Sequence, residues 1–309
     1  MKIKLSPLTP LKPLLYFSLF KYPLTESEIL AFSENKNQDE TEAALEKLVQ
    51  QKVVYKIDDF YCLENDQAQI DRRRDGNEGA KKIHKKADRR SRLISKFPFV
   101  EGVGLSGALS KGFFDKDGDM DFFIITSPGR LWVARTLLIL YKKIFLLNSK
   151  KYFCVNYFVS ENALEITEKN LFTATELVTL IPMYGNGSFN KFYDLNSWAY
   201  RQFPNKSYHE AINTLKPIKK PGFVNLIQNI LGTSLGDKLD AFLLKLTYKK
   251  WKVKFDHLDR DQFDIAMKST QDVSKHHPKN FQKRVITRLN EKYSEYQEKY
   301  DIPLSPEHA

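Results

Sequence analysis

The stretch GDMDFFIIT, residues 118–126, limits the possible folds of this chain more than any other feature. Its unbroken apolar run, Phe122–Ile125, predicts a strand buried inside a sheet. Asp119 and Asp121 stand two residues apart at its start, so in an extended segment they project from one face, while Met120 faces the opposite, packed side. Like charges held this close repel, and burial makes the repulsion worse. Either a cation neutralises the two carboxylates or they only flank a turn.

A second strand is expected just upstream. The sequence FVEGVGLSG, residues 99–107, predicts a short strand that runs into a turn of small residues, and Ser106, Gly107 and Ala108 should end that strand and open a helix through Leu109. Backbone N–H groups at such a turn can face a phosphate. Lys111 is close enough in sequence to add a positive charge there.

The rest of residues 97–205 continues this alternation of strands and helices. A long helix is predicted in PGRLWVARTLLILYKKIFLL, residues 128–147, and a third strand in KKYFCVNYFVS, residues 150–160. The segment from Thr173 to Phe203 is predicted to be helical, with breaks at Pro182 and at the following glycines. The expected fold class is therefore α/β (α+β), with a mixed sheet flanked by helices.

Residues 1–65 predict a small separate unit. An apolar helix is expected over Leu11–Phe20, and Thr25 followed by Glu28 has the spacing of a capping box for a second helix. Asp39 can cap a third helix, and VVYKIDDFYCL, residues 53–63, predicts a hairpin. Three helices and a hairpin make a winged helix-turn-helix. The predicted apolar face of the third helix comprises Ala43, Ala44, Leu48 and Val49.

Charge argues against DNA reading by this unit. The third helix carries Glu40, Glu42 and Glu46 against Lys47 and Lys52, so it offers phosphates no favourable field. A docking or structural role is the better interpretation. DNA binding stays open as an alternative.

Residues 66–96 are strongly basic. Their second half has helical spacing along Ile83, Ala87, Arg90 and Ile94, which predicts a solvated linking helix. The sharper interpretation is a basic wall beside an anionic ligand or RNA. Residues 206–309 are predicted to be a helical C-terminal region that runs to about Tyr300, with a break at SKHHPKN, residues 274–280.

Composition adds broad limits. The length of 309 residues allows two or three units, and a net charge of +11 favours an anionic partner: a nucleotide, a nucleic acid or a membrane surface. No apolar run reaches the roughly 20 residues of a membrane helix, and the first residues lack an apolar signal core, so we expect a cytoplasmic protein without a membrane partner. Cys62 and Cys154 lie in strand-like runs near no metal-ligand pattern and are expected to be buried thiols.

The turn of small residues and the two aspartates together resemble the nucleotidyltransferase superfamily that includes DNA polymerase beta. There a strand–turn–helix carries Gly-Ser or Gly-Gly, and D-x-D or D-x-E follows about ten residues later on the next strand. Gly107-Ala108 stands at the Gly-Ser position here, and Asp119-Met120-Asp121 at D-x-D. The chain also looks like a group of bacterial proteins with a winged-helix-like region before such a domain. That narrower resemblance covers roughly residues 10–205, through landmarks such as LFKYPLTESEI, GRLWVAR and NSWAYRQFPN.

The resemblance implies an enzyme of the EC 2.7.7 type. It would transfer a nucleoside monophosphate from an NTP, with ATP as the expected nucleotide, to an acceptor hydroxyl by two-metal catalysis with Mg²⁺ or Mn²⁺. Asp119 and Asp121 would hold the metals. Ser106, Gly107 and Ala108 would bind the phosphates together with Lys111. The acceptor, whether a small molecule, a protein or RNA, is left open.

Two positions depart from the family pattern. Ala108 replaces the serine that can hydrogen-bond a nucleotide phosphate. The strand that normally supplies a third carboxylate offers Asn156, which can ligate a metal as a third ligand but brings no charge and cannot act as a base. Either Glu161 or Glu165 reaches in, the substrate supplies its own base, or catalysis has been lost.

Rival interpretations follow from these departures. DKDGDMD, residues 115–121, could be a turn without metal; as a calcium loop it lacks the closing glutamate. The whole chain could be a catalytically degenerate nucleotide-binding module. A third possibility is a regulator that binds nucleic acid through its winged helix and basic segment.

Overall fold

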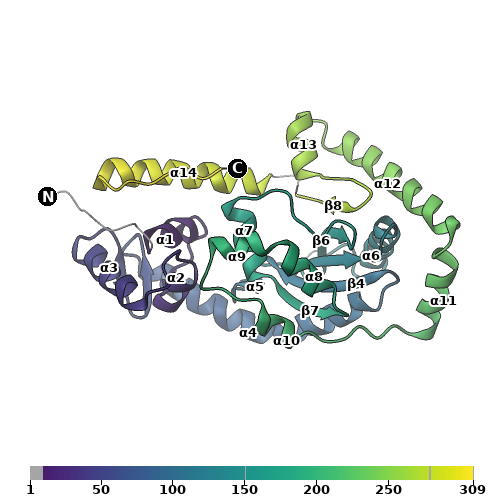
Figure 1. Ribbon diagram of the computed structural model, residues 1–309, viewed down its shortest axis with the longest axis horizontal. Helices are drawn as coiled ribbons and strands as arrows, with labels where there is room; N and C mark the ends of the chain where they lie inside the picture. Colours follow the sequence, from purple (N-terminus) through teal and green to yellow (C-terminus); the bar gives the residue numbers. More distant parts are fainter. Residues whose placement is uncertain (1–9, 150, 278–279, 309) are drawn as a thin grey trace.

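A five-stranded mixed sheet forms the centre of the protein, in the strand order β7-β4-β5-β6-β8 (Figure 1). The computed structural model describes residues 10–149, 151–277 and 280–308. β5 pairs in parallel with β6 and antiparallel with β4, and both edge strands run antiparallel to their neighbours. The strands are β4 (Val100–Ser106), β5 (Asp121–Thr126), β6 (Cys154–Ser160), β7 (Ile181–Gly185) and β8 (Val273–Lys275). The predicted mixed α/β class is confirmed.

Helices cover both faces of this sheet, which explains the unbroken apolar run in β5. Phe122 and Ile124 join a core with α4, α6, α12 and α13, whereas Phe123 and Ile125 join a core with α7, α8 and α9. A strand covered on both sides needs apolar residues at every position. The helices are α4 (Gln67–Ser95), α6 (Leu131–Phe145), α7 (Leu171–Thr179), α8 (Ser188–Leu195), α9 (Ser197–Gln202), α12 (Ser234–Lys254) and α13 (Arg260–Ala266).

The first part of the chain forms a smaller unit, residues 10–65, which we call the N-terminal unit (Figure 1). Its elements are α1 (Leu11–Ser18), β1 (Leu24–Thr25), α2 (Glu26–Ala31), α3 (Gln38–Gln50), β2 (Tyr55–Ile57) and β3 (Phe60–Cys62). The predicted capping box of Thr25 and Glu28 is confirmed, as is the hairpin, whose turn places Asp58 at a φ of 52°. β1, which the sequence did not predict, adds a third strand to it.

The N-cap predicted for α3 is wrong, and its predicted apolar face is right only at Leu48, which is buried, and Val49, which is half-buried. Its N-cap is Asn37, whose side chain accepts hydrogen bonds from the backbone of Asp39 and Glu40, so Asp39 is already inside the helix. Its buried face comprises Thr41, Leu45 and Leu48, an i, i+4, i+7 stripe. The two alanines lie at or beside the solvent face, where the glutamates 42 and 46 are also exposed.

The basic segment forms α4, a helix of 29 residues that fills almost all of the linking segment predicted over residues 66–96. It runs from the N-terminal unit to the central sheet (Figure 1). Ala87 and Ile94 are buried as expected. The helix begins at Gln67, where the side chain of Asp66 caps it by accepting from the backbone of Ala68. Two glycines inside it allow a close approach: Phe114 donates its backbone N–H to the carbonyl of Gly76 at 2.9 Å, and a Cβ on Gly79 would lie 2.1 Å from the carbonyl oxygen of Phe114.

The two edge strands were not predicted. The segment from Thr173 to Phe203, expected to be helical with breaks, contains β7 between α7 and α8. An edge strand tolerates proline because the backbone groups on its outer side need no partner strand, so the missing N–H of proline costs no ladder hydrogen bond. Pro182 lies in β7, which pairs with β4 alone among the named strands. β8 occupies the predicted break near residue 274 and pairs with β6.

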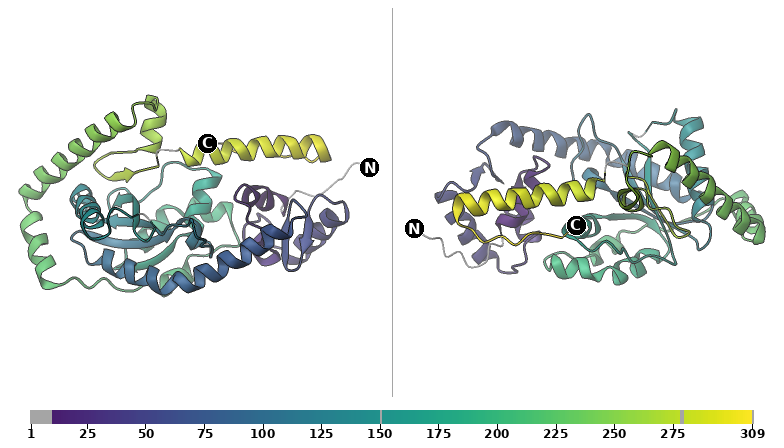
Figure 2. Two further views of the ribbon diagram at one scale, coloured as in Figure 1. Left: turned by 180° about the vertical axis from the view of Figure 1, so that it is seen from behind. Right: turned by 90° about the horizontal axis from the view of Figure 1, so that it is seen from above.

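The C-terminal helices separate in space. α10 (His209–Asn213) and α11 (Gly222–Leu231) lead into α12 and α13 at the sheet, whereas α14 (Phe281–Tyr300) lies along the N-terminal unit (Figure 2). Val285, Leu289 and Tyr293 of α14 share one hydrophobic core with Leu11 and Leu15 of α1. Among the described residues, none of the helices combines the length and the apolar character needed to span a bilayer.

Candidate functional site

The two aspartates of the sequence motif lie at the start of β5. Asp121 is the first residue of this strand and pairs with Ser106 at the end of β4 and with Cys154 at the start of β6. Asp119 precedes the strand, where Met120 already bonds through its backbone to Lys151 and Cys154. One ligand atom from each of Asp119, Asp121 and Cys154 lies within 4.8 Å of the others. The predicted convergence of the two carboxylates is therefore present.

Gly107 makes room for the Asp121 carboxylate. It begins the short helix α5 (Gly107–Ser110), as the sequence predicted. Its backbone φ is 71°, a value that residues with a side chain rarely adopt. A Cβ at this position would lie 2.5 Å from Oδ2 of Asp121. The turn of small residues and the D-x-D motif thus form one site, in which glycine serves both the backbone conformation and the close contact. Ala108, the next residue, is exposed.

The charge of Asp121 is poorly compensated by the protein itself. Burial and the neighbouring charge of Asp119 raise the pKa of Asp121 to about 7. Hydrogen bonds from Cys154 and Asn156 act in the opposite direction but are outweighed. A partly buried pair of acids, in which Asp121 has this raised pKa, is the arrangement that a divalent cation relieves, because the cation favours ionised carboxylates.

Cys154 was predicted to be a buried thiol near no metal-ligand pattern, and the second half of that prediction is wrong. The thiol is buried, but it lies beside both aspartates. Burial and the charge of Asp121 raise the pKa of Cys154, so it stays a neutral thiol and donates to Asp121. Mg²⁺ prefers oxygen ligands, so Asp119 and Asp121 fit this ion while Cys154 does not. The signal in the sequence that could have placed Cys154 at the site is its position as the first residue of β6, the strand that pairs with β5 at Asp121.

Asn156 reaches the site from β6. Its Nδ2 donates to Oδ1 of Asp121 at 3.0 Å, so the amide nitrogen, not the oxygen expected of a metal ligand, faces the carboxylate. The acids considered as substitutes lie elsewhere. Glu161 follows the far end of β6 and accepts a hydrogen bond from Ser188 at 2.6 Å, and Glu165 is exposed and pairs with Lys169 at 2.7 Å. Neither reaches Asp121.

Glu176 of α7 is an acid at this site that sequence reasoning missed. Its charge contributes to the raised pKa of Asp121. Lys111 lies at the same turn, where its Nζ contacts Oε1 of Glu176 at 2.8 Å and the carbonyl of Gly107 at 3.1 Å. The predicted phosphate-binding lysine is thus next to the site but already has an acidic partner. Nothing in the local sequence LFTATEL marks Glu176, because only the packing of α7 brings it here.

The loop between the two motifs is fixed by α4. Asn77 donates to the carbonyl of Gly112 at 2.7 Å, and Arg72 pairs with Asp115 at 3.2 Å. The helix interpreted as a basic link therefore holds the loop that carries Asp119. A pocket of about 380 Å³ lined by Lys56, Asp59 and Tyr61 lies in the N-terminal unit and is separate from this site.

The raised pKa of Asp121 predicts how metal binding depends on pH. A metal binds the ionised carboxylate, so protons compete with it below a pKa of about 7. We expect the affinity for Mn²⁺ to rise about tenfold between pH 6 and pH 8, since one proton is displaced in this range. Isothermal titration with Mn²⁺ at several pH values measures this. A flat affinity over that interval would show that Asp121 is not a ligand.

Comparison of this chain with known protein families, with curated proteins and with solved structures gave no match in any of the three.

Proposed function

We propose that this protein is a nucleotidyltransferase that moves a nucleoside monophosphate from an NTP, with ATP as the expected nucleotide, to an acceptor hydroxyl. One observation carries the proposal: the carboxylates of Asp119 and Asp121 converge within 4.8 Å at the start of a strand, beside a turn of small residues. This combination suits a divalent cation bound next to a phosphate chain. The acceptor oxygen would bond to the α-phosphorus while pyrophosphate leaves, and magnesium, when bound, would supply positive charge to the nucleotidyl group and to that pyrophosphate.

The residues of the chain would divide the work as follows. Asp119 and Asp121 hold the cation, and Asn156 fixes the orientation of Asp121 through its hydrogen bond of 3.0 Å. Gly107 keeps the space beside Asp121 open, so that the phosphates can approach the turn at Ser106 and Ala108. Lys111 would turn from Glu176 toward the phosphates when they arrive, since its Nζ already lies 3.1 Å from the carbonyl of Gly107 at this turn.

The direct experiment is a screen for pyrophosphate release. The purified chain is incubated with each of the four NTPs, Mg²⁺ or Mn²⁺, and fractions of cell extract as a source of acceptor. We expect one nucleotide to give metal-dependent transfer of label to an extract component. Absence of both transfer and metal-dependent nucleotide binding would overturn the proposal.

Asn156 favours a second candidate, a nucleotide-binding module without turnover. A side-chain amide supplies no negative charge and no base at the position where the family has its third carboxylate. Such a protein would bind an NTP with Mg²⁺ and transfer nothing in the same screen. Binding without label transfer thus separates this candidate from the enzyme.

Replacing Asn156 by Asp tests the third position directly. A third carboxylate beside Asp121 should strengthen Mn²⁺ binding about tenfold, because charge count sets the affinity of an oxygen site. Without metal it should lower the free energy of unfolding at pH 8 by about 1 kcal/mol, since it replaces a hydrogen bond with a repulsion. Titration calorimetry and denaturant unfolding measure the two effects. Asn162→Asp, at an exposed position just after β6, is the control, and Mn²⁺ binding unchanged in both variants would place Asn156 outside the metal site.

A further inference from the structure

Two consecutive helices, α11 and α12, carry large apolar side chains that point into solvent. These side chains are each 53–73% exposed: Phe223, Leu226 and Ile230 on α11, and Leu235, Phe242, Leu246 and Val253 on α12. With 3.6 residues per turn, the four on α12 fall within about 40° of one line along the helix. Scattered exposed apolar residues are common, but an aligned stripe marks an interaction surface. We call these seven residues the apolar stripe.

Folding of the protein does not require this stripe. The opposite side of α12 already makes the contacts that hold the helix to α6: the ring of Trp251 lies 6.3 Å from that of Trp132, and Asp240 accepts a hydrogen bond from the backbone of Val133 at 2.9 Å. Arg130 bonds the carbonyl of Leu231 at 2.6 Å and so fixes the connection between α11 and α12. The two helices lie at the edge of the molecule opposite the N-terminal unit (Figure 1).

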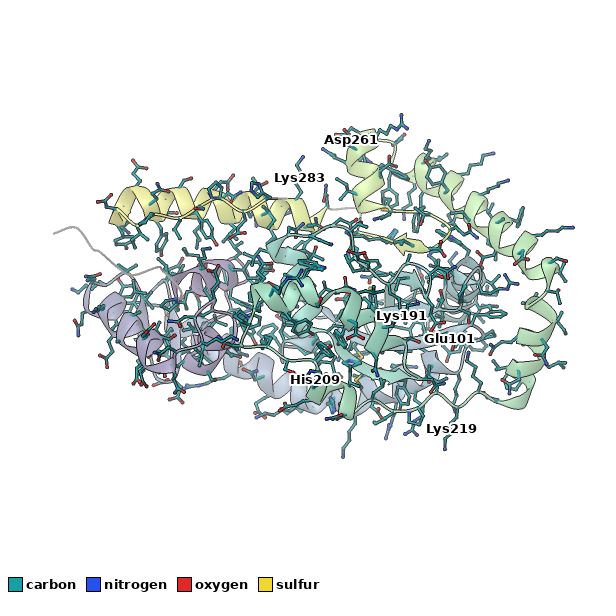
Figure 3. The ribbon with its side chains drawn as sticks, in the orientation of Figure 1. Glu101, Lys191, His209, Lys219, Asp261 and Lys283 are labelled. Atoms are coloured by element: carbon teal, nitrogen blue, oxygen red, sulfur yellow. The ribbon has the colours of Figure 1, made fainter. Side chains whose placement is uncertain are left out.

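The charge around the stripe has one sign. Exposed lysines flank it on α12: Lys238, Lys245, Lys249, Lys250, Lys252 and Lys254. The acids of α12 are Asp237 and Asp240, and both have partners inside the protein, Arg130 and the backbone of Val133. α11 carries no charged residue, and Lys219 just before it points away from the body of the protein (Figure 3). The surface is therefore apolar along its line and positive at its sides.

An apolar stripe with lysines at its sides indicates whether a second copy of the chain or a membrane binds to this surface. A second copy of the chain would bring the same lysines against these, and the exposed acid of the two helices, Asp237, is already paired with Arg130 on the side of α12 away from the stripe. We propose that α11 and α12 bind the surface of an anionic membrane, with the apolar stripe at the boundary between headgroups and acyl chains and the lysines against lipid phosphates. This goes beyond the expectation of no membrane partner, which considered only segments long enough to span. It does not depend on the proposed nucleotidyl transfer.

The test is co-sedimentation of the full chain with vesicles. We expect binding to vesicles of phosphatidylglycerol and phosphatidylcholine to be at least tenfold tighter than to phosphatidylcholine alone, and to weaken in high salt. Phe242→Ser with Leu246→Ser should reduce this binding at least tenfold, as should Lys249→Glu with Lys250→Glu. The replaced apolar side chains are 59% and 54% exposed, so the fold is kept, which circular dichroism checks.

Matched controls lie on α8. Leu195 is 43% exposed and Lys191 is also exposed, so Leu195→Ser and Lys191→Glu change an apolar and a basic surface residue elsewhere (Figure 3). Both should bind vesicles like the unchanged protein. The proposal is overturned if anionic vesicles are not bound, if controls and stripe variants lose binding equally, or if light scattering shows a dimer that Phe242→Ser with Leu246→Ser dissociates, because the stripe then belongs to a second copy.

Discussion

Asp121→Asn is expected to abolish metal-dependent nucleotide binding while making the protein more stable. Loss of one of the two carboxylates should weaken binding of an NTP with Mg²⁺ at least 100-fold, because the remaining Asp119 alone holds the cation poorly. The same change removes a partly buried charge that repels Asp119. Few surface substitutions should affect binding and stability in opposite directions, so the pair of results is diagnostic.

The sign of the stability change depends on pH. The folded pKa of Asp121, about 7, lies above the ordinary value, so the folded protein holds this proton more tightly than the unfolded chain. The resulting stabilisation is complete below about pH 4 and is lost as the pH rises through 7. Asp121→Asn should therefore raise the free energy of unfolding of the metal-free protein by about 2 kcal/mol at pH 8, a figure reduced from the full shift because the residue is partly exposed.

Denaturant unfolding at pH 4.5 and pH 8 measures this, with nucleotide binding followed by titration calorimetry. Asp117→Asn is the control, since Asp117 is an exposed acid in the same loop. It should change neither quantity. Normal binding of an NTP with Mg²⁺ by Asp121→Asn would remove the basis of the proposed function, whatever its stability.

Gly79→Ala should strongly destabilise the protein, although alanine is the better helix former by about 1 kcal/mol. Gly79 lies inside α4, and its Cβ would meet the carbonyl oxygen of Phe114 at 2.1 Å, a backbone atom that cannot turn aside. We expect the free energy of unfolding to fall by about 3 kcal/mol, as in other overpacked contacts. The shift of this loop should also move Asp119 and weaken Mn²⁺ binding.

Gly222→Ala is the matched control for this prediction. Gly222 begins α11, and no atom lies within 4 Å of the Cβ position. The control should leave the free energy of unfolding unchanged or slightly higher, measured by denaturant unfolding of both variants. If Gly79→Ala were as stable as Gly222→Ala, the contact between α4 and the loop would not be close in solution.

The features that sequence reasoning predicted well are local ones. The capping box of Thr25 and Glu28 needs only four consecutive residues, and the turn at Gly107 needs only a strand that ends in small residues. The buried strand after Asp121 follows from its composition alone. In each case a short run of residues is enough to predict the element, even though distant helices supply the contacts that bury β5.

The features that sequence reasoning missed are formed by contacts between segments that lie far apart in the chain. β8 is an edge strand of three residues whose pairing partner, β6, lies more than a hundred positions earlier. Glu176 and Cys154 join the site only because α7 and β6 pack beside β5, which their own neighbours in sequence do not reveal. The N-cap of α3 was missed although it is local, because Asn37, two residues before the predicted Asp39, makes the capping hydrogen bonds.

The position of α14 has a consequence for biosynthesis. The hydrophobic core around Leu11 and Leu24 is completed by Leu289, Tyr293 and Leu304. During translation the first helices leave the ribosome long before α14 is made. Their apolar faces therefore stay exposed to solvent until α14 has been synthesised. A chain that ends before residue 281 should therefore expose the core of its N-terminal unit and be more prone to aggregate than the whole chain.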